Sequence, residues 1–92
     1  MSLNIVVFII PEAGFFKEFG RKLAILKELT INENGCEIFD VYIFENKYVL
    51  IERWADQAAI DAHMREIYTE EFINQTKAHL EGIEVYRLES TQ

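Results

Sequence analysis

The 92-residue sequence predicts a single α+β domain, in which a four-stranded antiparallel sheet carries helices on one face. Four segments are rich in β-branched and aromatic residues, which is typical of strands. Between them, two stretches place apolar residues three and four positions apart, the spacing of an amphipathic helix. Their order along the chain is βαββαβ, a split βαβ arrangement that puts both helices on the same side of the sheet.

Each element has a local reason to begin or end where it does. Pro11 ends the first strand, and Asn34 with Gly35 ends the first helix, because either residue adopts the left-handed backbone that closes a helix. Asp56 is the expected N-cap of the second helix, which is interrupted over residues 65–69. The expected strands are residues 3–10, 36–44, 47–54 and 83–88, and the expected helical segments are residues 12–34, 56–64 and 70–81.

Charge pairing suggests a register for the hairpin between the second and third strands. A turn at residues 46–47 sets Asp40 opposite Arg53, whereas a slip of one residue sets Asp40 opposite Glu52. Opposite charges across a ladder stabilise it, so the first register is favoured. In that arrangement we expect Glu52 and Trp54 on the face that the helices leave uncovered, where an acid and an indole among apolar side chains are typical of a ligand cavity.

Composition narrows the class of protein. The net charge is −7 and the nine Lys and Arg residues are scattered, so we expect no nucleic-acid partner. The longest apolar run, residues 5–10, is too short to span a membrane, and the N-terminus lacks the regions of a signal peptide, so we expect a cytoplasmic protein. Cys36 is the only cysteine, and the two histidines, His63 and His79, are sixteen positions apart. We therefore expect no metal site built by the protein.

The uncovered face of the predicted sheet calls for a partner. Four strands of about eight residues present roughly 500 Å² in plan. Half of the residues are hydrophobic, which is more than one thin core requires. Exposed patches of that size usually mark an interaction site, so we expect a homodimer whose sheets face each other around a small cavity.

Three short stretches together resemble the E-x-G-C … E-x-W-x-D-x-x-A-x-x-x-H signature of antibiotic biosynthesis monooxygenase (ABM) domains. They are Glu33-Asn34-Gly35-Cys36, then Glu52-Arg53-Trp54, and then Asp56, Ala59 and His63. The resemblance implies a ferredoxin-like fold assembled as a dimeric α+β barrel, and it covers nearly the whole chain. Members often carry a second histidine five positions after the one that matches His63, and here that position is Tyr68.

Domains similar to these include cofactor-independent oxygenases of phenols, anthrones and quinols. The resemblance thus implies a cofactor-independent monooxygenase acting on a small planar phenol or quinol, in a cavity on the non-helical face of the sheet. Two alternatives remain open. One is haem degradation with His63 as the axial ligand, and the other is a non-catalytic module that binds a small apolar ligand or serves in a stress response.

Seven residues are candidates for the site. Glu52 and His63 are the catalytic candidates, because a buried carboxylate has a raised pKa and histidine transfers protons near neutral pH. Each also has a structural interpretation, as an ion pair across the dimer for Glu52 and as a hydrogen-bonded core group for His63. The candidates for binding substrate are Trp54, Asn4, Phe39, Tyr48 and Tyr68. Trp54 would stack on a planar ligand, although it also fits an aromatic core anchor paired with Phe39.

Overall fold

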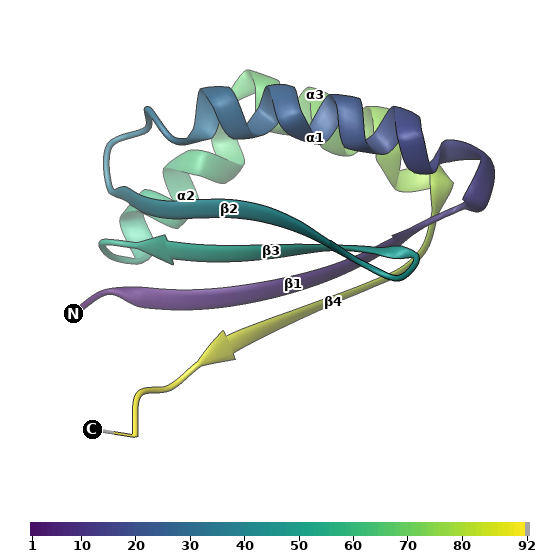
Figure 1. Ribbon diagram of the computed structural model, residues 1–92. Helices are drawn as coiled ribbons and strands as arrows, with labels where there is room; N and C mark the ends of the chain where they lie inside the picture. Colours follow the sequence, from purple (N-terminus) through teal and green to yellow (C-terminus); the bar gives the residue numbers. More distant parts are fainter. Residues whose placement is uncertain (92) are drawn as a thin grey trace.

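A computed structural model of the chain describes residues 1–91 and confirms the α+β class. The strands are β1 (Leu3–Pro11), β2 (Cys36–Phe44), β3 (Lys47–Trp54) and β4 (Leu80–Leu88). The helices are α1 (Phe16–Thr30), α2 (Gln57–Arg65) and α3 (Ile67–Thr76), with short 3-10 turns η1 (Ala13–Phe15) and η2 (Lys77–His79). The antiparallel sheet has the order β2-β3-β1-β4, and the helices all lie on one face of it (Figure 1). None of the helices in this part of the chain is long and apolar enough to cross a membrane.

Helix α1 packs on the sheet through the stripe that the sequence predicts. Phe19, Leu23, Leu26 and Thr30 are buried at spacings of three and four, so each helical turn contributes one core side chain. Ile25 and Leu29 of the same helix are also apolar, but their side chains are exposed. They lie instead on the outer surface, beside the groove between α1 and α3.

The predicted ends of two helices are wrong. Helix α1 ends at Thr30, with Ile31 as its C-cap, so Asn34 and Gly35 do not end the helix but lie in the loop that follows it. The expected start of this helix at residue 12 is replaced by the 3-10 turn η1, and α3 spans residues 67–76 where residues 70–81 were expected.

Gly35 has φ +88, a conformation that favours glycine, and a Cβ atom there would lie 2.6 Å from the Cβ of Ala59. The glycine therefore lets the loop after α1 approach α2 closely. Asp56 caps α2, since its Oδ1 accepts a hydrogen bond from the Ala59 N–H at 2.9 Å. The interruption expected over residues 65–69 is confined to Glu66, whose extended backbone separates α2 from α3.

The predicted hairpin register is wrong by two residues. Phe44 pairs with Lys47, so the two turn residues are Glu45 and Asn46, and Asp40 lies opposite Ile51 rather than Arg53. Glu45 takes the left-handed conformation at φ 57, which suits the mirrored turns of hairpins. A shift of two keeps every side chain on its expected face, because side chains alternate with a period of two. Pairing by charge was misleading here, since exposed charges contribute little to the register.

The charged groups of the hairpin find other partners. Asp40 lies 4.0 Å from the Nζ of Lys27 on α1, and the Arg53 Nε donates a hydrogen bond to the Asn4 Oδ1 at 3.0 Å. The expected structural pair of Asp40 with Arg53 therefore does not form.

Strand β4 is longer than expected and is the least covered part of the sheet. It begins at Leu80 rather than residue 83, and its pairing with β1 shifts register between Gly82 and Leu80, beside Pro11. Ile83 and Val85 pair directly with Ile9 and Val7, so they share the helix-covered face with those buried residues. Nevertheless Ile83 is 55% exposed and Val85 is 61% exposed. The helices thus cover β1, β3 and most of β2, and they leave this side of β4 open.

The opposite face of the sheet, which we call the open face, has no cover from the described residues. Large apolar side chains of β2, β3 and β4 are exposed on it, and they are Tyr42, Phe44, Ile51, Tyr86 and Leu88. Phe8 of β1 packs edge-on against Tyr86 across this face, with ring centroids 6.1 Å apart. The open face therefore carries many exposed apolar side chains, as the sequence predicts for the uncovered face of the sheet.

Candidate functional site

The candidate site lies beneath the helices and not on the open face. Trp54 is fully buried, and its ring centroid is 4.8 Å from that of His63 on α2. Glu52 is two residues earlier on the same side of β3. The expectation that Glu52 and Trp54 occupy the non-helical face is therefore wrong. The two faces of the hairpin were sorted correctly, but both are largely apolar, so alternation alone could not say which of them the helices cover.

His63 is held by Glu33, a residue of the loop that follows α1. The His63 Nδ1 lies 3.0 Å from each of the two carboxylate oxygens of Glu33, and each side chain is only 9% exposed. Ala59 precedes His63 by one helical turn, and it is the residue against which Gly35 packs. The close approach at Gly35 therefore brings Glu33 within reach of the imidazole.

Tyr68 of α3 is the third member of this hydrogen-bonded group. Its hydroxyl donates to the Oε2 of Glu33. Burial, followed by the hydrogen bond to Glu33, raises the pKa of the Tyr68 phenol, so the group remains a donor. We call Glu33, His63, Tyr68, Glu52 and Trp54 together the His63 cluster.

Glu52 and Trp54 form the second half of the His63 cluster. The Trp54 Nε1 donates a hydrogen bond to the Glu52 Oε1 at 2.9 Å, which satisfies the only polar atom of the buried indole side chain. Burial raises the pKa of the Glu52 carboxyl, and the hydrogen bond from Trp54 and the charge of His63 offset only part of that effect. The cluster thus combines an imidazole with a carboxyl group whose pKa is raised, and both side chains are of types that transfer protons in enzymes.

Cys36 borders the cluster without the environment of a reactive thiol. Burial, with the nearby charges of Glu33, Glu52 and Glu37, raises the pKa of its thiol to about 11. The thiolate is therefore disfavoured at neutral pH. Over residues 1–91, no group of three or more His, Cys, Asp or Glu side chains is placed to hold a metal ion.

The other sequence candidates separate into two groups. Phe39 is buried, and its ring centroid lies 6.0 Å from that of His63, so it forms a wall of the cluster. Asn4 lies opposite Arg53 and binds it on the open face, on the other side of the sheet. Tyr48 is six residues from Trp54 along β3, about 20 Å away, and its hydroxyl donates to the Phe16 carbonyl of α1 at 2.9 Å. Asn4 and Tyr48 are thus not part of the cluster.

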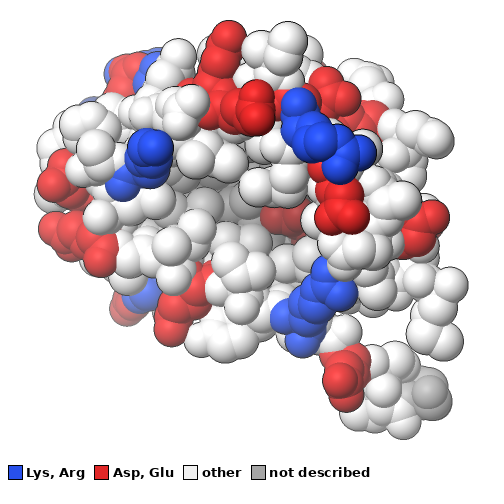
Figure 2. All heavy atoms as spheres, turned by 180° about the vertical axis from the view of Figure 1, so that it is seen from behind, with Lys and Arg blue, Asp and Glu red and all other residues white. Residues whose placement is uncertain are grey.

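A hollow gives access to the helix-covered side of the sheet. Viewed from behind, it opens between the layer of helices above and the strands below, and an acidic side chain lies deep within it (Figure 2). The exposed Ile83 and Val85 are on this side of β4. The uncovered side of β4 is therefore an exposed apolar strip on the helix-covered side of the sheet.

The residue that sequence reasoning missed is Glu33. It appears in the E-x-G-C stretch as part of the signature, but its position after a helix gave no reason to expect a partner thirty residues away. The sequence feature that could have identified Glu33 is the glycine two residues later. Gly35 has a left-handed backbone, which turns the loop towards α2. Only the tertiary contact with Ala59 shows that this turn delivers the carboxylate to His63.

Comparisons with known proteins agree with the fold. Protein PA3566 from Pseudomonas aeruginosa is 22% identical with a TM-score of 0.92, over 99% of this chain and 95% of its own. Rv0793 from Mycobacterium tuberculosis is 20% identical with a TM-score of 0.92, over 100% and 97%. A structure described as an antibiotic biosynthesis monooxygenase is 20% identical with a TM-score of 0.91, over 98% and 99%. At these identities the likeness shows the fold alone.

A comparison with curated proteins gives no match. The sequence profile of the antibiotic biosynthesis monooxygenase family matches residues 2–75, which include every member of the His63 cluster. The match covers most of the chain and agrees with the signature and with the observed fold. The chain therefore belongs to the antibiotic biosynthesis monooxygenase (ABM) family.

Proposed function

We propose that the protein is a cofactor-independent monooxygenase that oxidises a small planar phenol or quinol beside Trp54, on the helix-covered side of the sheet. One observation carries this proposal. The His63 imidazole, which is hydrogen-bonded to Glu33, and the buried Glu52 carboxyl both lie next to the buried indole of Trp54. His63 and Glu52 are the two groups that handle the proton. Trp54 and Phe39 provide aromatic walls, and the exposed Ile83 and Val85 side of β4 provides the approach.

The chemistry requires little more than deprotonation in a protected site. An electron-rich phenol loses its proton to the enzyme, and the anion passes one electron to O2. The radical pair recombines at carbon, and the resulting peroxide loses water to leave a quinone. One oxygen atom enters the product, the other leaves as water, and the substrate supplies all the electrons. Exclusion of bulk water protects the radical pair, which is consistent with the burial of Trp54 and His63.

We also propose that the protein is a homodimer formed through the open face. The support is the row of exposed apolar side chains across β2, β3 and β4, including Tyr42, Phe44 and Ile51. Apolar patches of this extent on a single chain usually mark a protein interface. Such an interface would lie on the opposite side of the sheet from the His63 cluster. Each protomer would therefore keep a cluster of its own.

Oxygen uptake across a panel of quinols and polycyclic phenols tests the proposed activity. We expect acceleration above autoxidation for at least one planar substrate. His63→Gln should lower kcat by about 100-fold or more, because general base catalysis contributes at least that much. His79→Gln is the matched control, since His79 is half-exposed and pairs with Glu12 away from the cluster.

The Glu52→Gln variant separates chemistry from structure at that position. Lost turnover with an unchanged dimer indicates a role in proton transfer, whereas unchanged turnover assigns Glu52 to holding Trp54. If the wild-type protein accelerates no member of the panel, the monooxygenase proposal is wrong. Saturable binding of the same compounds without turnover would then identify a binding module.

A further inference from the structure

We propose that Glu33 and Tyr68 are positioning residues, which hold the imidazole of His63 with Nδ1 protonated, so that Nε2 is the nitrogen that takes the proton from the substrate. This inference rests on the proposed function, in which His63 handles that proton. It also assigns Tyr68 a role other than contact with the substrate.

The hydrogen-bond inventory determines the tautomer. An ionised carboxylate accepts hydrogen bonds and donates none. Both oxygens of Glu33 lie 3.0 Å from the His63 Nδ1, so Nδ1 must carry a hydrogen for either contact to be favourable. In a neutral ring the proton is then absent from Nε2, which becomes the basic nitrogen. Because both side chains are only 9% exposed, water competes little for these contacts.

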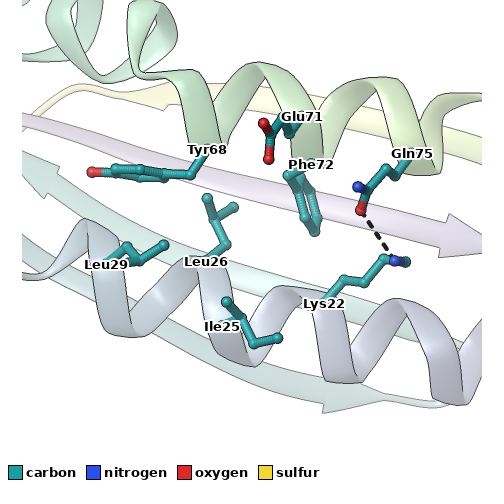
Figure 3. Close-up of a pocket in the computed structure, with 8 residues that line it drawn as sticks. All are labelled: Lys22, Ile25, Leu26, Leu29, Tyr68, Glu71, Phe72 and Gln75. Carbon is teal, nitrogen blue, oxygen red and sulfur yellow. Dashed lines mark hydrogen bonds between the residues drawn. The ribbon is translucent and has the colours of Figure 1, made fainter.

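Tyr68 fixes the carboxylate in turn. Its hydroxyl donates to the Oε2 of Glu33, so the two donors around this carboxylate come from two different helices. The Tyr68 ring lies in the wall of the groove between α1 and α3, beside Leu26 and Leu29. Figure 3 shows the hydroxyl pointing along α1 towards Leu29, the end of the helix from which the chain continues to Glu33. Packing of the ring therefore limits where the hydroxyl, and hence the carboxylate, can lie.

The backbone places Glu33 where this arrangement requires it. Gly35 packs against Ala59, and its carbonyl accepts a hydrogen bond from the Ala55 N–H at 2.8 Å. These contacts anchor the loop to the start of α2, one turn before His63. The position of Tyr68, five residues after His63, is the one at which family members often have a second histidine. In this chain that position is Tyr68, whose neutral hydroxyl donates a hydrogen bond to the Glu33 carboxylate.

The direct test reads the tautomer and needs no substrate. In 15N-labelled wild-type protein, long-range 1H–15N correlation of the imidazole rings identifies which nitrogen is protonated. Only two histidines contribute, so His79→Gln assigns both spin systems. We expect neutral His63 to be the Nδ1–H tautomer. A predominant Nε2–H tautomer would overturn the proposal, whatever the activity of the enzyme.

Variants then test whether the positioning matters for turnover. Glu33→Leu removes the acceptor and should return His63 to the Nε2–H tautomer, with kcat lower by about 100-fold or more. Tyr68→Phe should lower kcat by about tenfold and leave KM within about twofold, because the phenol acts through Glu33 and does not touch the substrate. Unchanged kcat, or a rise in KM alone, would overturn the role of Tyr68.

Tyr86→Phe is the matched control. Tyr86 also donates to a glutamate, Glu84, at 3.0 Å, but it is exposed on the open face. It should leave the tautomer and kcat unchanged. If the wild-type protein is inactive but His63 is the Nδ1–H tautomer, the proposed monooxygenase activity is wrong, whereas the hold of Glu33 on the imidazole is confirmed. The failure of one proposal can therefore be told from the failure of the other.

Discussion

The two faces of the sheet differ in how they are completed. Helices of the same chain cover most of one face, and the polar groups of its His63 cluster are paired, with Glu33 on His63 and Trp54 on Glu52. The open face exposes apolar side chains such as Phe44 and Ile51, and its charged groups make only exposed contacts. A buried polar group without a partner destabilises the folded chain, so it is usually paired within that chain. An exposed apolar surface can instead be covered by a second molecule. This contrast is the reason that we propose chemistry on the covered face and association through the open one.

The largest effect is expected from truncating the centre of the covered face. Trp54→Ala should lower the free energy of unfolding by about 3–5 kcal/mol, because it empties a fully buried site and leaves Glu52 without its donor. Chemical denaturation measures this loss. Ile25→Ala on the exposed side of α1 is the control and should change stability by less than about 0.5 kcal/mol. Equal losses for the two variants would contradict the assignment of Trp54 to the core.

A charged residue placed on the open face should disrupt the proposed dimer interface. Ile51 lies on the central strand β3 between Val6 and Asp40, so Ile51→Glu should weaken the dimer about 100-fold, equivalent to about 3 kcal/mol. Analytical ultracentrifugation measures the dissociation constant. Ile25→Glu carries the same charge change on the helical side and should leave the dimer intact. A wild-type protein that is monomeric at micromolar concentration would remove the proposed interface.

The close approach of the loop to α2 sharpens the comparison on the covered side. Gly35→Ala should cost about 2 kcal/mol of stability, since it strains a backbone at φ +88 and drives a Cβ against Ala59. Gly14→Ala is the control, because nothing lies within 4 Å of the added atom. Thermal unfolding of both variants measures the difference. An equally mild effect at both positions would show that the loop can move away from α2.

The smallest effect is the pH dependence that Glu52 contributes. Its pKa is raised above the ordinary value of 4.5 by burial, so the folded protein keeps this proton to higher pH than the unfolded chain does. The associated stability is complete below pH 4.5 and is lost as the pH rises through the folded-state pKa. Glu52→Gln cannot ionise and keeps an oxygen for Trp54, so it should be more stable than wild type at pH 7 and lose that advantage in acid. Denaturation at both pH values measures this, and a less stable variant at pH 7 would contradict the sign.

Much of the fold could be predicted from the sequence because its signals are local. Pro11, the α1 stripe and the Asp56 cap act within a few residues, and they appear where expected. The hairpin register failed because it was inferred from surface charges, whereas the turn geometry at Glu45 decides it. A single extended residue, Glu66, separates α2 from α3. No proline or glycine marks this position in the sequence, so its exact place could not be predicted.

The site was less predictable for a physical reason. His63, Trp54 and Glu52 were found as residue types near one corner of the chain, and the structure brings them together with Phe39. Which face they occupy depends on how the helices cross the sheet, and an apolar strand has no signal for that when both of its faces are hydrophobic. Asn4 was misplaced relative to Trp54 for the same reason.

One measurement tests the central claim, that the ligand site is on the covered face beside Trp54. This is the only tryptophan of the chain, so intrinsic fluorescence reports on that position alone. Titration with a planar phenol should change the emission saturably, and His63→Gln should weaken the binding while Tyr86→Phe should not. Saturable binding by calorimetry with no change in Trp54 emission would place the ligand elsewhere and contradict the account.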